Sequence, residues 1–89
     1  MKKSYGIRVT GKVQNVGFRY YTVQAAKDFN IDGFVKNQMD GSVYIEAEGE
    51  NDALEGFISW CRRGPHYARV DGFEIQEQPL MGYDGFKVK

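Results

Sequence analysis

The residues best suited to chemistry lie close together near the N-terminus, in the segment Gly11–Arg19, which we call the anion loop. Gly11 and Gly17 lie near its ends, Lys12 and Arg19 supply two positive charges, and the segment contains no acidic residue. A guanidinium presents a planar fork of N–H donors that matches the oxygens of a phosphoryl group or a similar small oxyanion. These residue types therefore indicate a binding site for a small anion.

The flanking sequence places the anion loop between a strand and a helix. Apolar residues alternate before Gly11, which is typical of a strand, and beyond Gly17 they are spaced as on one face of a helix. The strand residues are Tyr5, Ile7 and Val9, with Gly11 ending the strand, and the helix residues are Phe18, Thr22, Ala25 and Phe29. The start of such a helix has unpaired backbone N–H groups and a partial positive charge, so it attracts anions.

Arg19 is unusual because it places a cation in the first turn of this helix, at the positive end of the dipole. That placement costs roughly 0.3 kcal/mol or more. A local rule broken in this way often marks a functional site, and a bound anion would compensate for it. The alternative is an ordinary strand-to-helix connection in which Arg19 extends into solvent. The segment has neither the Gly-Lys-Ser/Thr of a P-loop nor the three-glycine spacing of a dinucleotide fingerprint.

The rest of the chain predicts a hairpin, a second helix and two further strands. Residues 33–37 and 43–48 are typical of strands joined by the turn dipeptide Asp40-Gly41, and strands follow at 73–76 and 86–88. The second helix starts near Asn51 or Asp52, either of which could cap it, and ends at Gly64-Pro65. The residues expected to be buried are Val43, Ile45 and Ala47 on one strand face, opposite Tyr44, Glu46 and Glu48, and Leu54, Phe57, Ile58 and Cys61 on the helix.

This element order predicts an α+β fold, a ferredoxin-like βαββαβ sandwich in which two helices cover one face of an antiparallel sheet. The 89 residues are expected to form a single domain, residues 1–89. Gly56 lies inside the second helix, where close packing against the first helix or the sheet would explain it.

The composition restricts the partners of the protein. Twelve basic and twelve acidic residues balance, which argues against a nucleic-acid-binding domain. No apolar run is long enough for a membrane span, and no apolar segment follows the basic N-terminus, so no signal peptide is expected. The single cysteine, Cys61, is expected to be a buried core thiol and allows no intramolecular disulfide, so we expect a cytoplasmic protein. Nothing in the sequence indicates an oligomer, so we expect a monomer. No side chains with metal-ligand spacing are present, so no metal is expected.

Two segments resemble a known family. The anion loop is similar to a signature of the acylphosphatases, G-x-V-Q-G-V-x-F-R, and residues 33–43 resemble that family's other signature, G-[FYW]-V-[KR]-N-x-x-D-G-x-V. Residues 47–49 and 64–70 also resemble the family, so the similarity covers essentially the whole chain. Two signatures at the proper separation are more specific than either alone, and the family's ferredoxin-like fold agrees with the predicted order.

The resemblance implies metal-independent hydrolysis of the carboxyl–phosphate bond of a small acyl phosphate, without a cofactor. By correspondence with the signatures, Arg19 would bind the phosphoryl group and Asn37 would position the attacking water. The backbone N–H groups that would complete the phosphate site are those of Gln14, Asn15, Val16, Gly17 and Phe18. Inorganic phosphate, the product, would compete with the substrate. Phosphoryl transfer to water depends mainly on positioning and charge stabilisation, so such a sparse site is chemically sufficient.

Asn15 departs from the family pattern, which usually has glycine at that position. If the loop needs a positive φ there, asparagine is the least costly replacement, because it tolerates the left-handed region. We therefore expect Asn15→Gly to retain activity.

Two other functions remain open from the sequence. Many RNA-binding modules share the predicted fold, but they need stacking aromatic residues within recognisable motifs, and Gly85-Phe86-Lys87-Val88 matches such a motif poorly. A non-catalytic anion-sensing domain could use the same loop. The single histidine, His66, is expected to be an ordinary loop residue.

Overall fold

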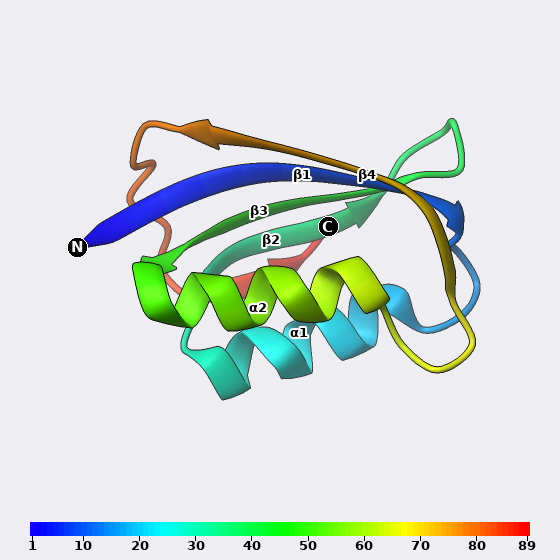
Figure 1. Cartoon of the computed structure of the whole chain (residues 1–89), viewed down its shortest axis with the longest axis horizontal. Coiled ribbons are helices and arrows are strands. Elements are labelled where there is room, and N and C mark those ends of the chain that lie inside the picture. The colour runs from blue at the N-terminus through cyan, green and yellow to red at the C-terminus, as the bar shows by residue number, and fades with distance from the viewer.

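Both helices pack on one face of a five-stranded sheet in the computed structural model, which describes residues 1–89 (Figure 1). The elements in chain order are β1 (Lys2–Lys12), α1 (Phe18–Phe29), β2 (Asp32–Asn37), β3 (Val43–Glu50), α2 (Asn51–Arg63), β4 (Arg69–Gln78) and β5 (Phe86–Val88). The first strand continues one residue past Gly11, where the register with β4 shifts and the chain bulges. β4 is longer than the predicted 73–76, because residues 69–72 also pair with the end of β1.

The strand order β4-β1-β3-β2-β5 confirms the ferredoxin-like fold. The first four strands pair antiparallel, as expected, whereas β5 runs parallel to β2 and makes the sheet mixed. This difference arises because residues 79–85 return across the end of the sheet before β5 adds to the edge of β2. The last strand therefore lies beside β2, the strand that ends at Asn37.

The core lies between the sheet and the helices. The strand residues predicted to face it are fully buried, as are Leu54, Phe57 and Cys61 of α2, while Ile58 is half-buried at the edge of the stripe. Burial raises the pKa of the Cys61 thiol, as expected of a core cysteine. An added Cβ on Gly56 would lie 2.4 Å from the Phe29 ring of α1, which confirms that close helix packing explains this glycine.

Two sequence-based details about charged residues are wrong. Neither Asn51 nor Asp52 caps α2, because β3 leads directly into the helix and Glu50 is the N-cap, with no side-chain capping bond. Glu48, expected to face solvent, is only 6% exposed, since the segment before β5 covers it. The backbone N–H groups of Met81, Gly82 and Tyr83 donate to its carboxylate at 2.6, 3.0 and 3.1 Å.

The connections β1–α1 and β2–β3 meet at one end of the molecule (Figure 1). The first contains the anion loop, and the second follows Asn37. This arrangement brings both segments that resemble family signatures to the same end of the fold.

Candidate functional site

The anion loop exposes a run of backbone donors. Asn15 and Gly17 adopt left-handed conformations, with φ of 62° and 77°, on either side of Val16. The N–H groups of Gln14, Asn15, Val16 and Gly17 donate no hydrogen bond within the protein, and the first helical bond runs from Tyr21 N–H to Gly17 O at 3.0 Å. Consecutive N–H groups in such a conformation form a concave site for an anion. The condition attached to Asn15, a positive φ, is therefore met.

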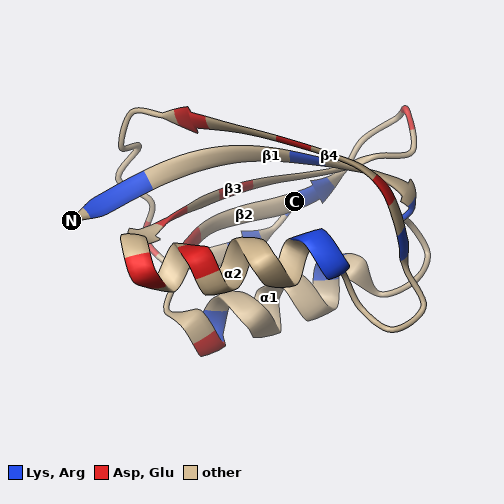
Figure 2. Ribbon diagram, viewed as in Figure 1, with Lys and Arg blue, Asp and Glu red and all other residues tan.

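The charges at the two helix starts differ (Figure 2). Helix α2 has Asp52 in its first turn and Arg62 and Arg63 in its last, as the helix dipole favours. Helix α1 has no acidic residue in its first turn, and Arg19 occupies that turn instead. Its guanidinium is exposed, with Nη1 3.5 Å from the carbonyl oxygen of Lys89, and forms no ion pair with a side chain. The positive helix end thus coincides with a guanidinium that has no side-chain ion pair.

The side chain of Gln14 holds the anion loop in place. Its Nε2 donates to the carbonyl oxygens of Gln38 at 2.7 Å and Ser42 at 2.9 Å, in the β2–β3 connection. Gln38 directly follows Asn37, so these bonds fix the loop relative to the end of β2. The amide side chain is committed to this anchoring, whereas the backbone N–H of Gln14 remains available.

A cleft of about 360 Å³ lies where these segments meet, and we call it the loop cleft. Its lining residues are Val13, Asn15, Gly17, Phe18, Arg19, Tyr20, Asn37 and Val88. The cleft brings Arg19 together with Asn37, the two residues predicted to be catalytic, and includes three of the predicted loop residues. Gln14 and Val16 do not line it. No carboxylate or imidazole is among the lining residues.

Sequence reasoning missed Val13, Tyr20 and Val88 as part of this cleft. Tyr20 could have been suspected because it follows Arg19 in the same helical turn. Val88 carries no local signal, since only the pairing of β5 with β2 brings it to the cleft.

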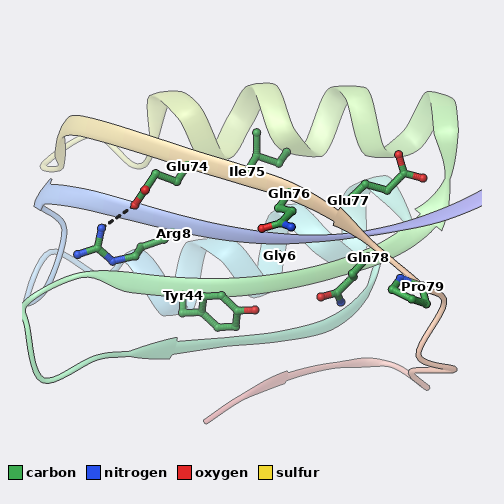
Figure 3. Close-up of a pocket in the computed structure, with 9 residues that line it drawn as sticks. All are labelled: Gly6, Arg8, Tyr44, Glu74, Ile75, Gln76, Glu77, Gln78 and Pro79. Carbon is green, nitrogen blue, oxygen red and sulfur yellow. Dashed lines mark hydrogen bonds and ion pairs between the residues drawn. The ribbon is translucent and has the colours of Figure 1, made fainter.

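A larger hollow of about 670 Å³ lies on the helix-free face of the sheet, over Gly6 (Figure 3). Its only cation, Arg8, already pairs with Glu74 at 2.7 Å and with Asp40 at 2.8 Å. Because both carboxylates neutralise this guanidinium, the hollow presents no free positive charge to an anion. Of the two hollows, only the loop cleft combines a guanidinium that has no side-chain ion pair with unpaired backbone N–H groups.

Three further observations concern metal ligands, membrane-spanning helices and the single histidine. No cluster of three or more His, Cys, Asp or Glu side chains has a geometry that could bind a metal ion. No helix has the length and apolar character needed to cross a membrane. His66 lies exposed in the α2–β4 connection, edge-on to Tyr67, and does not line the loop cleft.

Comparison with known proteins gives one consistent result. The acylphosphatase family model matches residues 5–88. The acylphosphatase of Thermotoga petrophila is 44% identical over 87 residues, covering 98% of this chain and 97% of that protein. The acylphosphatase of Archaeoglobus fulgidus is 45% identical over 82 residues, covering 92% of each. The crystal structure of an acylphosphatase from Bacillus subtilis superimposes with a TM-score of 0.94 at 37% identity, covering 100% of this chain and 99% of that one.

Proposed function

The chain belongs to the acylphosphatase family and is an acylphosphate phosphohydrolase, and we propose that the loop cleft is where it hydrolyses its substrate. The observation that carries this proposal is that Arg19 and Asn37, from different elements, line one cleft beside unpaired backbone N–H groups. The reaction converts an acyl phosphate and water into a carboxylate and inorganic phosphate.

In this proposal the anion loop holds the phosphoryl group. The N–H groups of Gln14 to Phe18 donate to its oxygens, and Arg19 adds a charge-assisted pair of hydrogen bonds. The backbone donors are in place before the substrate binds, because Gln14 anchors the loop, and the first turn of α1 places Arg19 beside them. Preorganised donors stabilise the charge that develops on the phosphoryl oxygens in the transition state.

Asn37 positions the attacking water. Its side-chain carbonyl accepts a hydrogen bond from the water and directs an oxygen lone pair at phosphorus. As the new P–O bond forms, the bond from phosphorus to the acyl oxygen breaks, and the carboxylate leaves with that electron pair. The water proton passes to a phosphate oxygen or to solvent, because the lining residues offer no base. A carboxylate is a stable leaving group, so no side-chain acid is required.

We further propose that the protein acts as a cytoplasmic monomer with small acyl phosphates as substrates, without nucleic-acid or membrane partners. Cys61 is buried and unpaired, which suits a reducing compartment. We also propose that residues 1–89 act as one domain, since both helices and the sheet share one core. Light scattering coupled to size exclusion would test the monomer.

The RNA-binding alternative is not favoured. The aromatic residues of the helix-free face, Phe34 and Tyr44, pack against each other, and Tyr83 covers Phe34 edge-on. Phe34 is only 8% exposed, so it offers no free ring for a base to stack on.

The test is hydrolysis of benzoyl phosphate by the purified protein, with and without EDTA. We expect turnover that the chelator does not change. Arg19→Ala and Asn37→Ala should each lower kcat by about 10²–10³, the usual effect of losing one preorganised group. A matched control is Lys27→Ala, an exposed cation in the last turn of α1, at the other end of that helix from Arg19, which should leave kcat unchanged. Full activity in Arg19→Ala or Asn37→Ala would refute the role assigned to that residue.

A further inference from the structure

The lining residues of the loop cleft are of two chemical kinds. Asn15, Arg19 and Asn37 are polar, and Val13, Phe18, Tyr20 and Val88 are largely apolar. Val13 and Phe18 are 0% and 2% exposed, so their side chains belong to the core. Tyr20 is 61% exposed and Val88 is 52% exposed. These two residues therefore supply the free apolar surface of the cleft.

Both residues lie directly beside the groups assigned to the phosphoryl group. Tyr20 follows Arg19 in the first turn of α1. Val88 pairs with Val35 of β2, which lies two residues before Asn37, so Val88, Val35 and Asn37 share one face of the sheet. The next residue, Lys89, places its carbonyl oxygen 3.5 Å from Nη1 of Arg19. The apolar surface thus comes from two elements that meet at Arg19.

The chemistry of the substrate determines what this surface would contact. In an acyl phosphate a single oxygen joins phosphorus to the acyl carbon, so a phosphoryl group held by the anion loop leaves the acyl group within the same cleft. Arg19 is the only charged lining residue, and it is engaged with the phosphoryl group. The remaining wall is a tyrosine ring and a valine side chain, which suit a planar apolar group rather than a charged one.

Tyr20 also has an aromatic neighbour outside the cleft. Its ring meets that of Tyr21 edge-on, with centroids 5.1 Å apart and an interplanar angle of 80°. Tyr21 does not line the cleft. This contact restricts the rotation of the Tyr20 side chain, which lowers the conformational entropy lost when a ligand stacks on the ring.

We propose that Tyr20 and Val88 contact the acyl group and give the enzyme a preference for planar, apolar acyl phosphates over small ones. This inference rests on the proposed function, because it assumes that the anion loop holds the phosphoryl end. It assigns to Tyr20 and Val88 the choice of substrate, whereas Arg19 and Asn37 carry out the reaction.

The experiment compares kcat/KM for benzoyl phosphate with kcat/KM for acetyl phosphate, and measures the inhibition constant of inorganic phosphate. The wild-type ratio should exceed one. Tyr20→Ala should lower it by about threefold to tenfold, the worth of an aromatic contact. Val88→Thr, which keeps the branched shape of the side chain, should lower it by a smaller factor. Tyr20→Phe should keep the wild-type ratio. Tyr67→Ala, which removes an exposed tyrosine outside the cleft, is the matched control and should also keep it.

The outcomes separate this inference from the proposed function. A wild-type protein that hydrolyses neither substrate would overturn the function itself. Two other outcomes would overturn only the acyl-group assignment, provided that the wild type hydrolyses both substrates. One is a wild-type ratio of kcat/KM for benzoyl phosphate to that for acetyl phosphate that does not exceed one. The other is a ratio that Tyr20→Ala and Val88→Thr leave unchanged. An inhibition constant for phosphate that is unchanged in Tyr20→Ala, together with a lowered ratio, would confirm that the phosphoryl end is intact and that Tyr20 acts on the acyl end.

Discussion

Gln14 donates a hydrogen bond of 2.7 Å from Nε2 to the carbonyl oxygen of Gln38, and this bond joins the anion loop to the residue that directly follows Asn37. The donors that would hold the phosphoryl group and the amide that would direct the water belong to segments more than twenty positions apart in the chain. One side chain that does not itself line the loop cleft therefore ties the two segments together directly, in addition to the pairing of β1 and β2 with β3.

We expect Gln14→Ala to lower kcat/KM for benzoyl phosphate by about 10-fold to 100-fold, since small displacements of reacting groups have effects of that size. The variant loses both bonds from Nε2, to Gln38 and to Ser42. Steady-state kinetics and urea denaturation together check the prediction. Gln76→Ala, on the helix-free face, is the control and should match the wild type. Unchanged kinetics in Gln14→Ala would show that the loop keeps its position without this anchor.

Asn15→Gly should retain phosphate binding and a kcat/KM within about threefold of the wild type. Glycine adopts the observed φ of 62° without strain, so the backbone donors keep their geometry. Asn15→Ala should instead lose about 1 kcal/mol of stability, because alanine is strained in the left-handed region. Isothermal titration with inorganic phosphate and thermal unfolding distinguish the variants. Loss of phosphate binding in Asn15→Gly would mean that the asparagine side chain, not the backbone, makes the contact.

Glu48→Gln should lower the free energy of unfolding at pH 7 by about 1–2 kcal/mol, because the carboxylate accepts three backbone N–H groups. Burial alone would raise the pKa of Glu48, but the N–H donors of Met81, Tyr83 and Gly82 outweigh it and hold the pKa below its usual value. A lowered folded pKa means that this stabilisation is present above the unfolded pKa of about 4.3 and is lost as the pH falls through the folded value.

The difference in the free energy of unfolding between the wild type and Glu48→Gln should therefore be constant near neutral pH and become smaller below about pH 4. Urea denaturation across this range measures it. Glu77→Gln, an exposed glutamate on β4, is the control and should show no such dependence. A difference that persists undiminished in acid would assign the effect of Glu48→Gln to packing rather than to charge.

Gly56→Ala should destabilise the protein by about 1 kcal/mol, despite the higher helix propensity of alanine. The new Cβ would lie 2.4 Å from Cε1 of Phe29, so the ring must move. Ser59→Ala, on the exposed face of α2, should be nearly neutral. In the double variant Gly56→Ala with Phe29→Leu, the smaller side chain should restore most of the stability lost in Gly56→Ala. If the two substitutions instead destabilise the protein additively, the cost of Gly56→Ala does not come from contact with Phe29.

Local patterns in the sequence predicted most of the fold, because hydrophobic spacing and turn residues act over short distances. They identified both helices, and β5 at Phe86–Val88 matches the prediction. The burial of Glu48 could not be read from its strand, since its partners come from residues 81–83. The parallel pairing of β5 is likewise a long-range contact with no local signal.

The residues of the candidate site also fall into those that local sequence patterns identified and those that only the tertiary structure revealed. Arg19 and Asn37 lie in two recognisable segments, and the fold places both at the loop cleft. Val88 was missed because it comes from the opposite end of the chain. The anchoring by Gln14 was missed because its acceptors are backbone carbonyls, whose positions depend on the tertiary structure.

The approach of Lys89 to Arg19 spans 70 positions in the chain, so the loop cleft is complete only when the two ends of the chain have come together. Contacts of such high sequence separation require closure of nearly the whole chain, and a high contact order slows folding. Local helix formation could place Arg19 early, but Val88 reaches the cleft only after β5 pairs with β2. During refolding, recovery of the preference for benzoyl phosphate over acetyl phosphate would therefore report the pairing of β5. Recovery of phosphate binding would report formation of the anion loop.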